Sequence, residues 1–142
     1  MTSPTPPLPR PAARNSSVKR VAVLAAVADV ALILLFAAIG RDAHQRGGII
    51  TGLLATAWPF LAGAAASWAA LRVWRAPLAV WPAGVGIWLG TVAVGMLLRA
   101  LTGQTVVLPF VIVALLALGV FLLGYRLLAA GVRRLRARRR QG

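Results

Sequence analysis

Hydrophobic positions along the chain gather in four long blocks that are separated by short polar stretches. The blocks cover residues 21–39, 49–71, 80–101 and 106–130, and each approaches the roughly 20 residues that a helix needs to cross a bilayer. Backbone groups in lipid must be satisfied within their own segment, which favours helices over strands. Connections this short place successive helices antiparallel. The pattern predicts an all-α integral membrane protein, with four transmembrane helices in an antiparallel up-down bundle and no soluble domain.

The two ends of the chain differ from these blocks. Residues 1–20 are basic and rich in proline, so they cannot bury enough apolar surface to offset the entropy of ordering, and we predict a disordered cytoplasmic tail. Residues 131–142 form a second, arginine-rich cytoplasmic tail. The positive-inside rule sets the orientation, because most basic residues fall on one side of the predicted bundle: Arg10, Arg14, Lys19, Arg20, Arg72, Arg75, Arg126, Arg133, Arg134, Arg136, Arg138, Arg139 and Arg140. Only Arg41, Arg46 and Arg99 remain for the other side, so we expect a plasma-membrane protein with both termini in the cytoplasm.

Composition narrows the possible chemistry. With 60% hydrophobic and 13% charged residues, the chain is too apolar for a soluble domain of 142 residues. The sequence has no cysteine, one histidine and two acids, which are too few ligands for a stable metal site. No serine is placed beside His44, which argues against a hydrolytic triad. We expect no enzymatic activity, no cofactor and no metal.

Asp29 is the main candidate for a functional residue inside the membrane. A carboxylate near the bilayer centre is costly, by about 2.5–3.5 kcal/mol on insertion scales, so it normally faces the bundle interior and has a partner. At about 1.5 Å per residue from Arg20, Asp29 is expected level with Gly63, Trp88 and Gly119. Trp88 could donate its indole N–H there. Two interpretations stay open: a neutral, hydrogen-bonded acid with a structural role, or a group that handles a proton or cation.

Arg99 is a more distant candidate. By the same helical rise it lies about 14 Å further out than Asp29, which is beyond the reach of one side chain and leaves only a water-bridged contact.

Prolines and small residues predict local helix geometry. Pro59 falls well inside the second block, so it should kink that helix and free the carbonyl of Ala55. Pro82 and Pro109 fall in the first turns of the third and fourth helices, where a missing N–H costs nothing. Small residues at helical spacing should let the second and third helices approach closely: Gly63, Ser67, Gly86 and Gly90.

Two polar regions lie at the rims of the predicted bundle. The outer rim contains Arg41, Asp42 and His44, which are expected near Arg99 and Gln104, and it favours solvated contact with headgroups over a specific ligand site. The arginine-rich C-terminal tail is expected to bind anionic lipid headgroups at the cytoplasmic face, through Arg133, Arg134, Arg136, Arg138, Arg139 and Arg140. Nucleic acid is not an expected partner, because no folded module supports its recognition.

Several stretches occur in a distinctive order: "DVALILLFAAIGRDAH", "GLLATAWPFLAG", "WPAGVGIWLGTVAVGMLLRALTGQ" and "PFVIVA". Over about residues 28–128 the chain resembles the small membrane proteins called domain of unknown function 3054, found mostly in actinobacteria and haloarchaea. The resemblance implies a compact multi-pass bundle. It implies no activity or ligand, so no site residue can be transferred. The family motifs include Asp29, Arg41, His44, Pro59, Trp81, Pro82, Arg99 and Gln104.

Two functional hypotheses follow. The first is a small proton- or cation-coupled transporter unit that uses Asp29 and the kinked second helix, in the manner of other four-helix transporters with an acid in the first helix. The second is an accessory or assembly subunit, which binds another membrane protein through small-residue helix faces. A homo-oligomer is an expected assembly for the transporter unit. An intramembrane enzyme acting on lipid is the weakest alternative, because the chain lacks a nucleophile or metal constellation.

Overall fold

Four long helices form the part of the chain that the structure describes. This computed structural model describes the backbone of residues 11–42 and 48–142, and the side chains of residues 15–40 and 48–142. The helices are α1 (Pro11–Asp42), α2 (Ile49–Ala70), α3 (Val85–Leu101) and α4 (Leu108–Arg139), with two short turns, η1 (Val73–Arg75) and η2 (Val80–Gly84), between α2 and α3. No strand occurs among these residues.

The prediction that the chain is all-helical, with four helices of membrane-spanning length, is confirmed for the described residues. The structure has four helical segments long and apolar enough to cross a membrane, Asn15–Gly40, Ile49–Ala70, Val80–Leu101 and Leu108–Arg139. The last two begin close to the predicted positions, and α4 has Pro109 in its first turn as expected.

The start of α1 and the end of α4 differ from the prediction. Helix α1 begins at Pro11, so residues 11–20, expected to be disordered, are helical, while residues 1–10 lie outside the described residues. Proline suits the first turn of a helix, and from there the helix runs without a break into the apolar span. Helix α4 likewise continues through most of the arginine-rich tail, because arginine is a good helix former.

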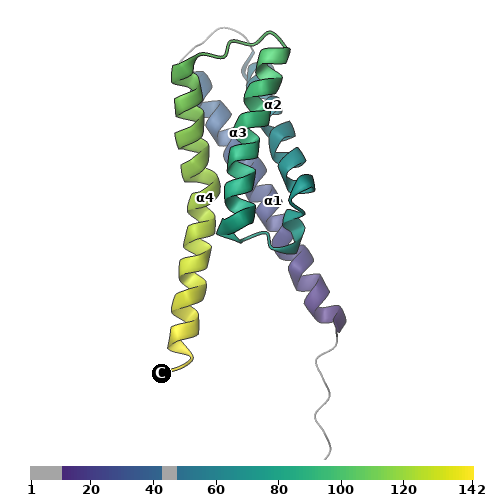
Figure 1. Ribbon diagram of the computed structural model, residues 1–142, viewed down its shortest axis with the longest axis vertical. Helices are drawn as coiled ribbons and strands as arrows, with labels where there is room; N and C mark the ends of the chain where they lie inside the picture. The colour runs from purple at the N-terminus through teal and green to yellow at the C-terminus, as the bar shows by residue number, and fades with distance from the viewer. Residues whose placement is uncertain (1–10, 43–47) are drawn as a thin grey trace, which may run out of the picture.

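These extensions shape one end of the molecule. Figure 1 shows the α3–α4 connection at the top of the view, with the α2–α3 connection and the C-terminus towards the bottom. Helices α1 and α4 continue past the α2–α3 connection and diverge below it.

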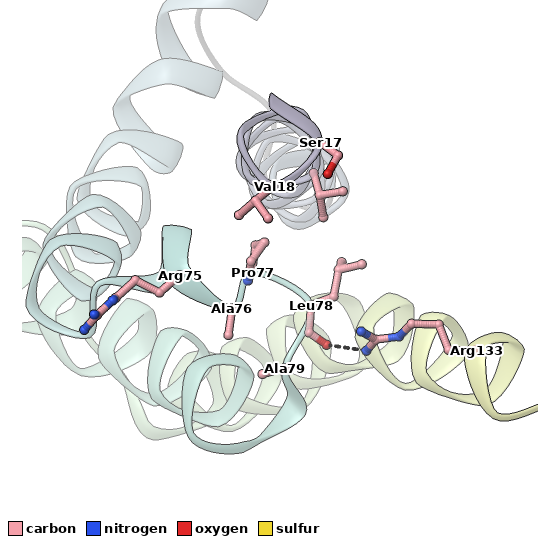
Figure 2. A pocket seen from close by; sticks show the side chains of 9 residues that line it. Ser17, Val18, Arg75, Ala76, Pro77, Leu78, Ala79 and Arg133 are labelled. Atoms are coloured by element: carbon pink, nitrogen blue, oxygen red, sulfur yellow. Dashed lines mark hydrogen bonds between the residues drawn. The ribbon is translucent and has the colours of Figure 1, made fainter. Parts of the chain in front are cut away.

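The diverging helices leave a hollow against the α2–α3 connection, with a volume of about 360 Å³. Figure 2 shows Ser17 and Val18 of α1 on one side and Arg133 of α4 on another, with the connection between them. Its lining is completed by Val21 and residues 75–79.

In α1 and in α4 the buried core residues form one stripe along the helix. In α1 the buried positions include Ala25, Ile33 and Phe36, and in α4 they include Ala114 and Leu118. Spacings near four residues put these side chains on one helix face. At the end of the bundle away from the hollow, three aromatic rings meet: Phe36, Phe60 and Phe110, with centroids 5.4–6.3 Å apart.

Helices α2 and α3 approach closely through glycine, as the sequence predicted. A Cβ added at Gly63 would lie 2.9 Å from the carbonyl oxygen of Thr91, and one at Gly90 would clash with the Ser67 side chain. A Cβ at Gly86 would likewise clash with Leu71. The small residues therefore allow backbone-level contact between these two helices.

Pro59 and Pro82 agree with their predicted effects only in part. Pro59 lies inside α2, and the carbonyl of Ala55, which loses its usual donor, accepts a hydrogen bond from the Gln104 amide at 3.4 Å. Pro82 lies in η2 directly before α3, where Trp81 has extended dihedral angles and the Trp81–Pro82 peptide bond is cis. Gln104 thus joins the α3–α4 connection to α2.

A buried aspartate–arginine pair as the candidate functional site

Asp29 lies on the buried stripe of α1. It is four residues after Ala25 and four before Ile33, both of which are buried, and its own exposed fraction is 1%. Arg126 holds the equivalent place on α4, four residues after the buried Leu122, and its exposed fraction is 0%. The helical spacing that builds the core therefore also points these two charged side chains at each other.

The two side chains form a bidentate ion pair. Arg126 Nη1 donates to Asp29 Oδ1 at 2.8 Å, and Arg126 Nη2 donates to Asp29 Oδ2, also at 2.8 Å. Parallel N–H···O bonds between a guanidinium and a carboxylate are short, strong and directional. The pair therefore fixes both the distance and the relative rotation of α1 and α4 at this level.

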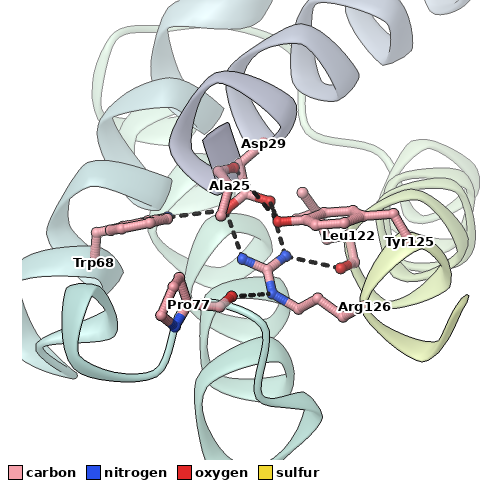
Figure 3. Close-up of polar contacts among 7 residues, drawn as sticks. All are labelled: Ala25, Asp29, Trp68, Pro77, Leu122, Tyr125 and Arg126. Atoms are coloured by element: carbon pink, nitrogen blue, oxygen red, sulfur yellow. Dashed lines mark hydrogen bonds and ion pairs between the residues drawn. The ribbon is translucent and has the colours of Figure 1, made fainter. Parts of the chain in front are cut away.

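Two aromatic residues complete the surroundings of Asp29. Trp68 Nε1 donates to Oδ2 at 2.9 Å, and the Tyr125 hydroxyl donates to Oδ1 at 2.7 Å (Figure 3). An ionised carboxylate offers about four lone-pair positions, so each oxygen accepting two hydrogen bonds matches its capacity. All four contacts come from groups that can donate, which is the pattern of an ionised acid.

Arg126 also donates to two backbone carbonyls, one in the α2–α3 connection and one in its own helix. Its Nε donates to the carbonyl of Pro77 at 3.2 Å, and Nη1 donates to the carbonyl of Leu122 at 2.8 Å. Gly84 makes room for the side chain, since a Cβ there would lie 2.9 Å from Arg126 Cδ. The guanidinium carbon also lies 4.6 Å from the centre of the Tyr125 ring. The site thus connects α1, α2, α4 and the α2–α3 connection.

This arrangement corrects the expected surroundings of Asp29. The indole that contacts it belongs to Trp68, whereas Trp88 donates to the carbonyl of Leu115 at 2.9 Å and packs against Gly119. Asp29 is therefore level with the end of α2 and not with its middle. A level counted from Arg20 is wrong because α1 and α2 do not end at the same height: α1 continues past the α2–α3 connection (Figure 1).

Arg126 was missed as a partner because its sequence position suggested solvent. It was counted with the basic residues of the cytoplasmic side, although it lies inside the apolar block 106–130. One signal was available, since Arg126 continues the spacing of the buried residues Leu118 and Leu122.

Arg99 takes no part in this site. Its Nη2 donates to the carbonyl of Thr105 at 3.1 Å, and its guanidinium carbon lies 4.5 Å from the centre of the Phe110 ring. No hydrogen bond or ion pair joins it to Asp29 among the residues with described side chains. Arg99 and Gln104 thus lie at the end of the bundle away from the aspartate.

The remaining predicted rim residues cannot be placed with them. The side chains of Arg41, Asp42 and His44 lie outside the described residues. Within the described part of the chain, no group of three or more potential metal ligands comes together.

The arginines of the C-terminal segment are exposed along the last turns of α4: Arg133, Arg134, Arg136, Arg138, Arg139 and Arg140. Arg133 is the member that touches another element, because its Nη2 donates to the carbonyl of Leu78 at 3.4 Å.

Comparison with known proteins gives one relationship. No curated protein and no solved structure matches the chain. A family model does match, over residues 26–129, and this segment contains both Asp29 and Arg126 together with all the residues that hold them. The chain therefore belongs to the family described as "Protein of unknown function (DUF3054)".

Proposed function

We propose that the protein crosses the plasma membrane four times as an antiparallel up-down bundle, with both termini in the cytoplasm. Four apolar helical segments of sufficient length support the insertion. The orientation is supported by the basic residues at the ends of α1 and α4 and in the α2–α3 connection, since such residues stay on the cytoplasmic side. In this orientation the Asp29–Arg126 pair lies near the cytoplasmic side of the bundle.

Within this bundle we propose a small proton- or cation-coupled transporter unit, in which the Asp29–Arg126 pair is the cytoplasmic gate. The observation that carries the proposal is the buried, bidentate pair between α1 and α4, beside the α2–α3 connection. Ionisable residues within membrane spans usually mark ion or substrate pathways. Apolar residues of similar volume often hold helices together as well as a buried ion pair does, so stability alone is a weak reason for the pair.

The geometry gives the gate a mechanism. A proton or cation that displaces one donor from an Asp29 oxygen would neutralise the carboxylate and remove most of its attraction for Arg126. Arg126 would still be held by the carbonyls of Pro77 and Leu122, on the side of α4 and the α2–α3 connection. The contact that breaks is therefore the one between α1 and the rest of the site.

A non-enzymatic role is part of this proposal. Ser67, the serine that lies within a predicted span, donates its hydroxyl to the carbonyl of Gly63 at 2.8 Å and is buried. A hydroxyl occupied in this way inside a helix contact is not arranged as a nucleophile.

Proton flux into vesicles tests the transporter proposal. The purified full-length chain would be reconstituted in vesicles containing a pH-sensitive dye, and flux would be driven by a potassium diffusion potential. We expect flux above that of empty vesicles for the wild-type chain. Asp29→Asn should abolish this flux because it removes the titratable group, whereas Asp29→Glu should retain part of it. A cation-dependent flux would be measured in the same vesicles with sodium.

Arg136→Gln provides the matched control. It changes one arginine on the same helix, at an exposed position, and should leave flux unchanged. Size-exclusion profiles would be compared for all variants, and only variants that elute as the wild type does would be used for flux. Flux through Asp29→Asn equal to that of the wild type would refute the gate. The absence of proton or sodium flux in the wild type would refute the transporter.

A further inference from the structure

The hollow between α1, α4 and the α2–α3 connection combines two kinds of surface. Val18, Val21 and Leu78 supply apolar side chains, while Arg133 supplies a guanidinium at the rim. Val18 and Val21 are 42% and 36% exposed, so part of their surface remains uncovered. Its volume of about 360 Å³ falls within the range of roughly 300–1,000 Å³ seen for small-molecule sites.

The position of the hollow along the chain is that of a membrane surface. Val21 lies at the start of the apolar run of α1, directly after Lys19 and Arg20. Arg133 lies at the start of the cationic run of α4, soon after the apolar Leu127 and Leu128. Both helices therefore change from apolar to basic at the height of the hollow. A phospholipid has the same order of parts, with apolar acyl chains towards the membrane interior and a charged headgroup at the surface.

We infer that this hollow binds one anionic phospholipid, with its phosphate on Arg133 and the upper part of an acyl chain against Val18 and Val21. Guanidinium groups bind phosphate oxygens through paired N–H donors. Within the described part of the chain Arg133 donates one hydrogen bond, a long one of 3.4 Å to the Leu78 carbonyl, out of the five N–H donors that an arginine carries. Basic pockets between helices on the cytoplasmic side are known sites for anionic headgroups.

The charge of the chain favours an anionic occupant over a zwitterionic one. The sequence carries a formal net charge of +14, and the residues that follow Arg133 along α4 are mostly arginine. A bound lipid would also rest on Pro77, whose carbonyl accepts from Arg126, and so would brace the connection that holds the ion pair. The inference rests on the proposed membrane orientation and not on the proposed transport activity.

Lipid retention by the purified full-length chain provides the test. The protein would be titrated in neutral detergent with phosphatidylglycerol or phosphatidylcholine, and bound lipid would be counted by native mass spectrometry. We expect one tightly retained phosphatidylglycerol and no equivalent phosphatidylcholine. Because this readout does not involve flux, it can succeed or fail independently of the transport assay.

Two pairs of variants separate a built site from general attraction to the basic tail. A basic residue near a membrane surface changes affinity for anionic lipid by roughly fivefold without any specific contact. Arg133→Gln should weaken phosphatidylglycerol retention by more than about tenfold, as expected for loss of a charge-assisted bond. Arg139→Gln removes the same charge outside the hollow and should cost no more than about fivefold.

The second pair leaves charge unchanged. Val18→Trp fills the hollow from an exposed position and should reduce retention, whereas Val23→Trp, on α1 but outside the lining, should not. Equal losses for Arg133→Gln and Arg139→Gln would overturn the site and leave only a basic tail. Equal retention of phosphatidylglycerol and phosphatidylcholine would overturn it too. So would displacement of the lipid by an equal concentration of glycerophosphate, which lacks acyl chains.

Discussion

Removal of either member of the Asp29–Arg126 pair should strongly destabilise the protein. In Arg126→Met, the buried carboxylate would keep only the Trp68 and Tyr125 donors and lose both guanidinium bonds. In Asp29→Leu, the guanidinium would keep only two backbone carbonyls. Breaking a buried pair on one side typically costs about 3–5 kcal/mol, since it leaves an uncompensated charge. We expect each single substitution to lower the free energy of unfolding by about that amount.

The double substitution Asp29→Leu/Arg126→Met should cost less than either single one. It removes both charges and costs four polar groups a hydrogen bond: Trp68 Nε1, the Tyr125 hydroxyl, and the carbonyls of Pro77 and Leu122. Interhelical hydrogen bonds in membrane proteins contribute about 0.6 kcal/mol each on average, so the expected loss is roughly 2 kcal/mol. If the effects of the two single substitutions were additive, the double variant would lose about 6 kcal/mol or more. The difference between this sum and the measured loss is the coupling energy of the pair.

Reversible unfolding in mixed micelles measures these free energies. The fraction of sodium dodecyl sulfate would be raised stepwise, and tryptophan fluorescence would follow the loss of tertiary structure, because Trp68 contacts the pair directly. Arg136→Met makes the same chemical change at an exposed position of α4 and should alter stability by less than about 0.5 kcal/mol. The reasoning would be refuted if each single variant unfolded with a free energy within about 1 kcal/mol of the wild type. It would also be refuted if the loss in the double variant equalled the sum of the two single losses.

Three further predictions use the same unfolding titration. Trp68→Phe should cost about 0.6–1.7 kcal/mol, because one donor to the carboxylate is lost; no loss would show that this bond does not contribute. Gly95→Ala should cost about 1–3 kcal/mol, since its Cβ would lie 2.6 Å from the Phe60 ring, whereas Gly124→Ala, with no atom within 4 Å, should gain about 0.5–1 kcal/mol. An equal effect at both glycines would contradict the steric cause. Gln104→Leu should cost under about 1 kcal/mol, because its 3.4 Å bond is long, and a larger loss would mean that this contact holds the helices together.

The sequence by itself determined the elements of this protein. Runs of about twenty apolar residues allow few structures other than helices in a membrane, so four spans followed from length and composition. The position of Pro109 and the close approach at Gly63 and Gly90 also followed from local rules, because they depend on one helix or on one neighbouring pair. The family was evident for the same reason, since its motifs lie within these segments.

The partner of Asp29 was decided only by the tertiary structure. Which residues meet across a bundle depends on how far each helix is shifted along its axis and how it is rotated, and neither quantity is written in a single segment. Helix α1 continues past the end of α2, and this axial shift places Asp29 level with Trp68 and not with the middle of α2. That shift brings in Trp68 and Arg126 where Trp88 was expected. A basic residue near the end of a span then becomes the buried counterion, because its helix face and not its nearness to the tail sets its surroundings.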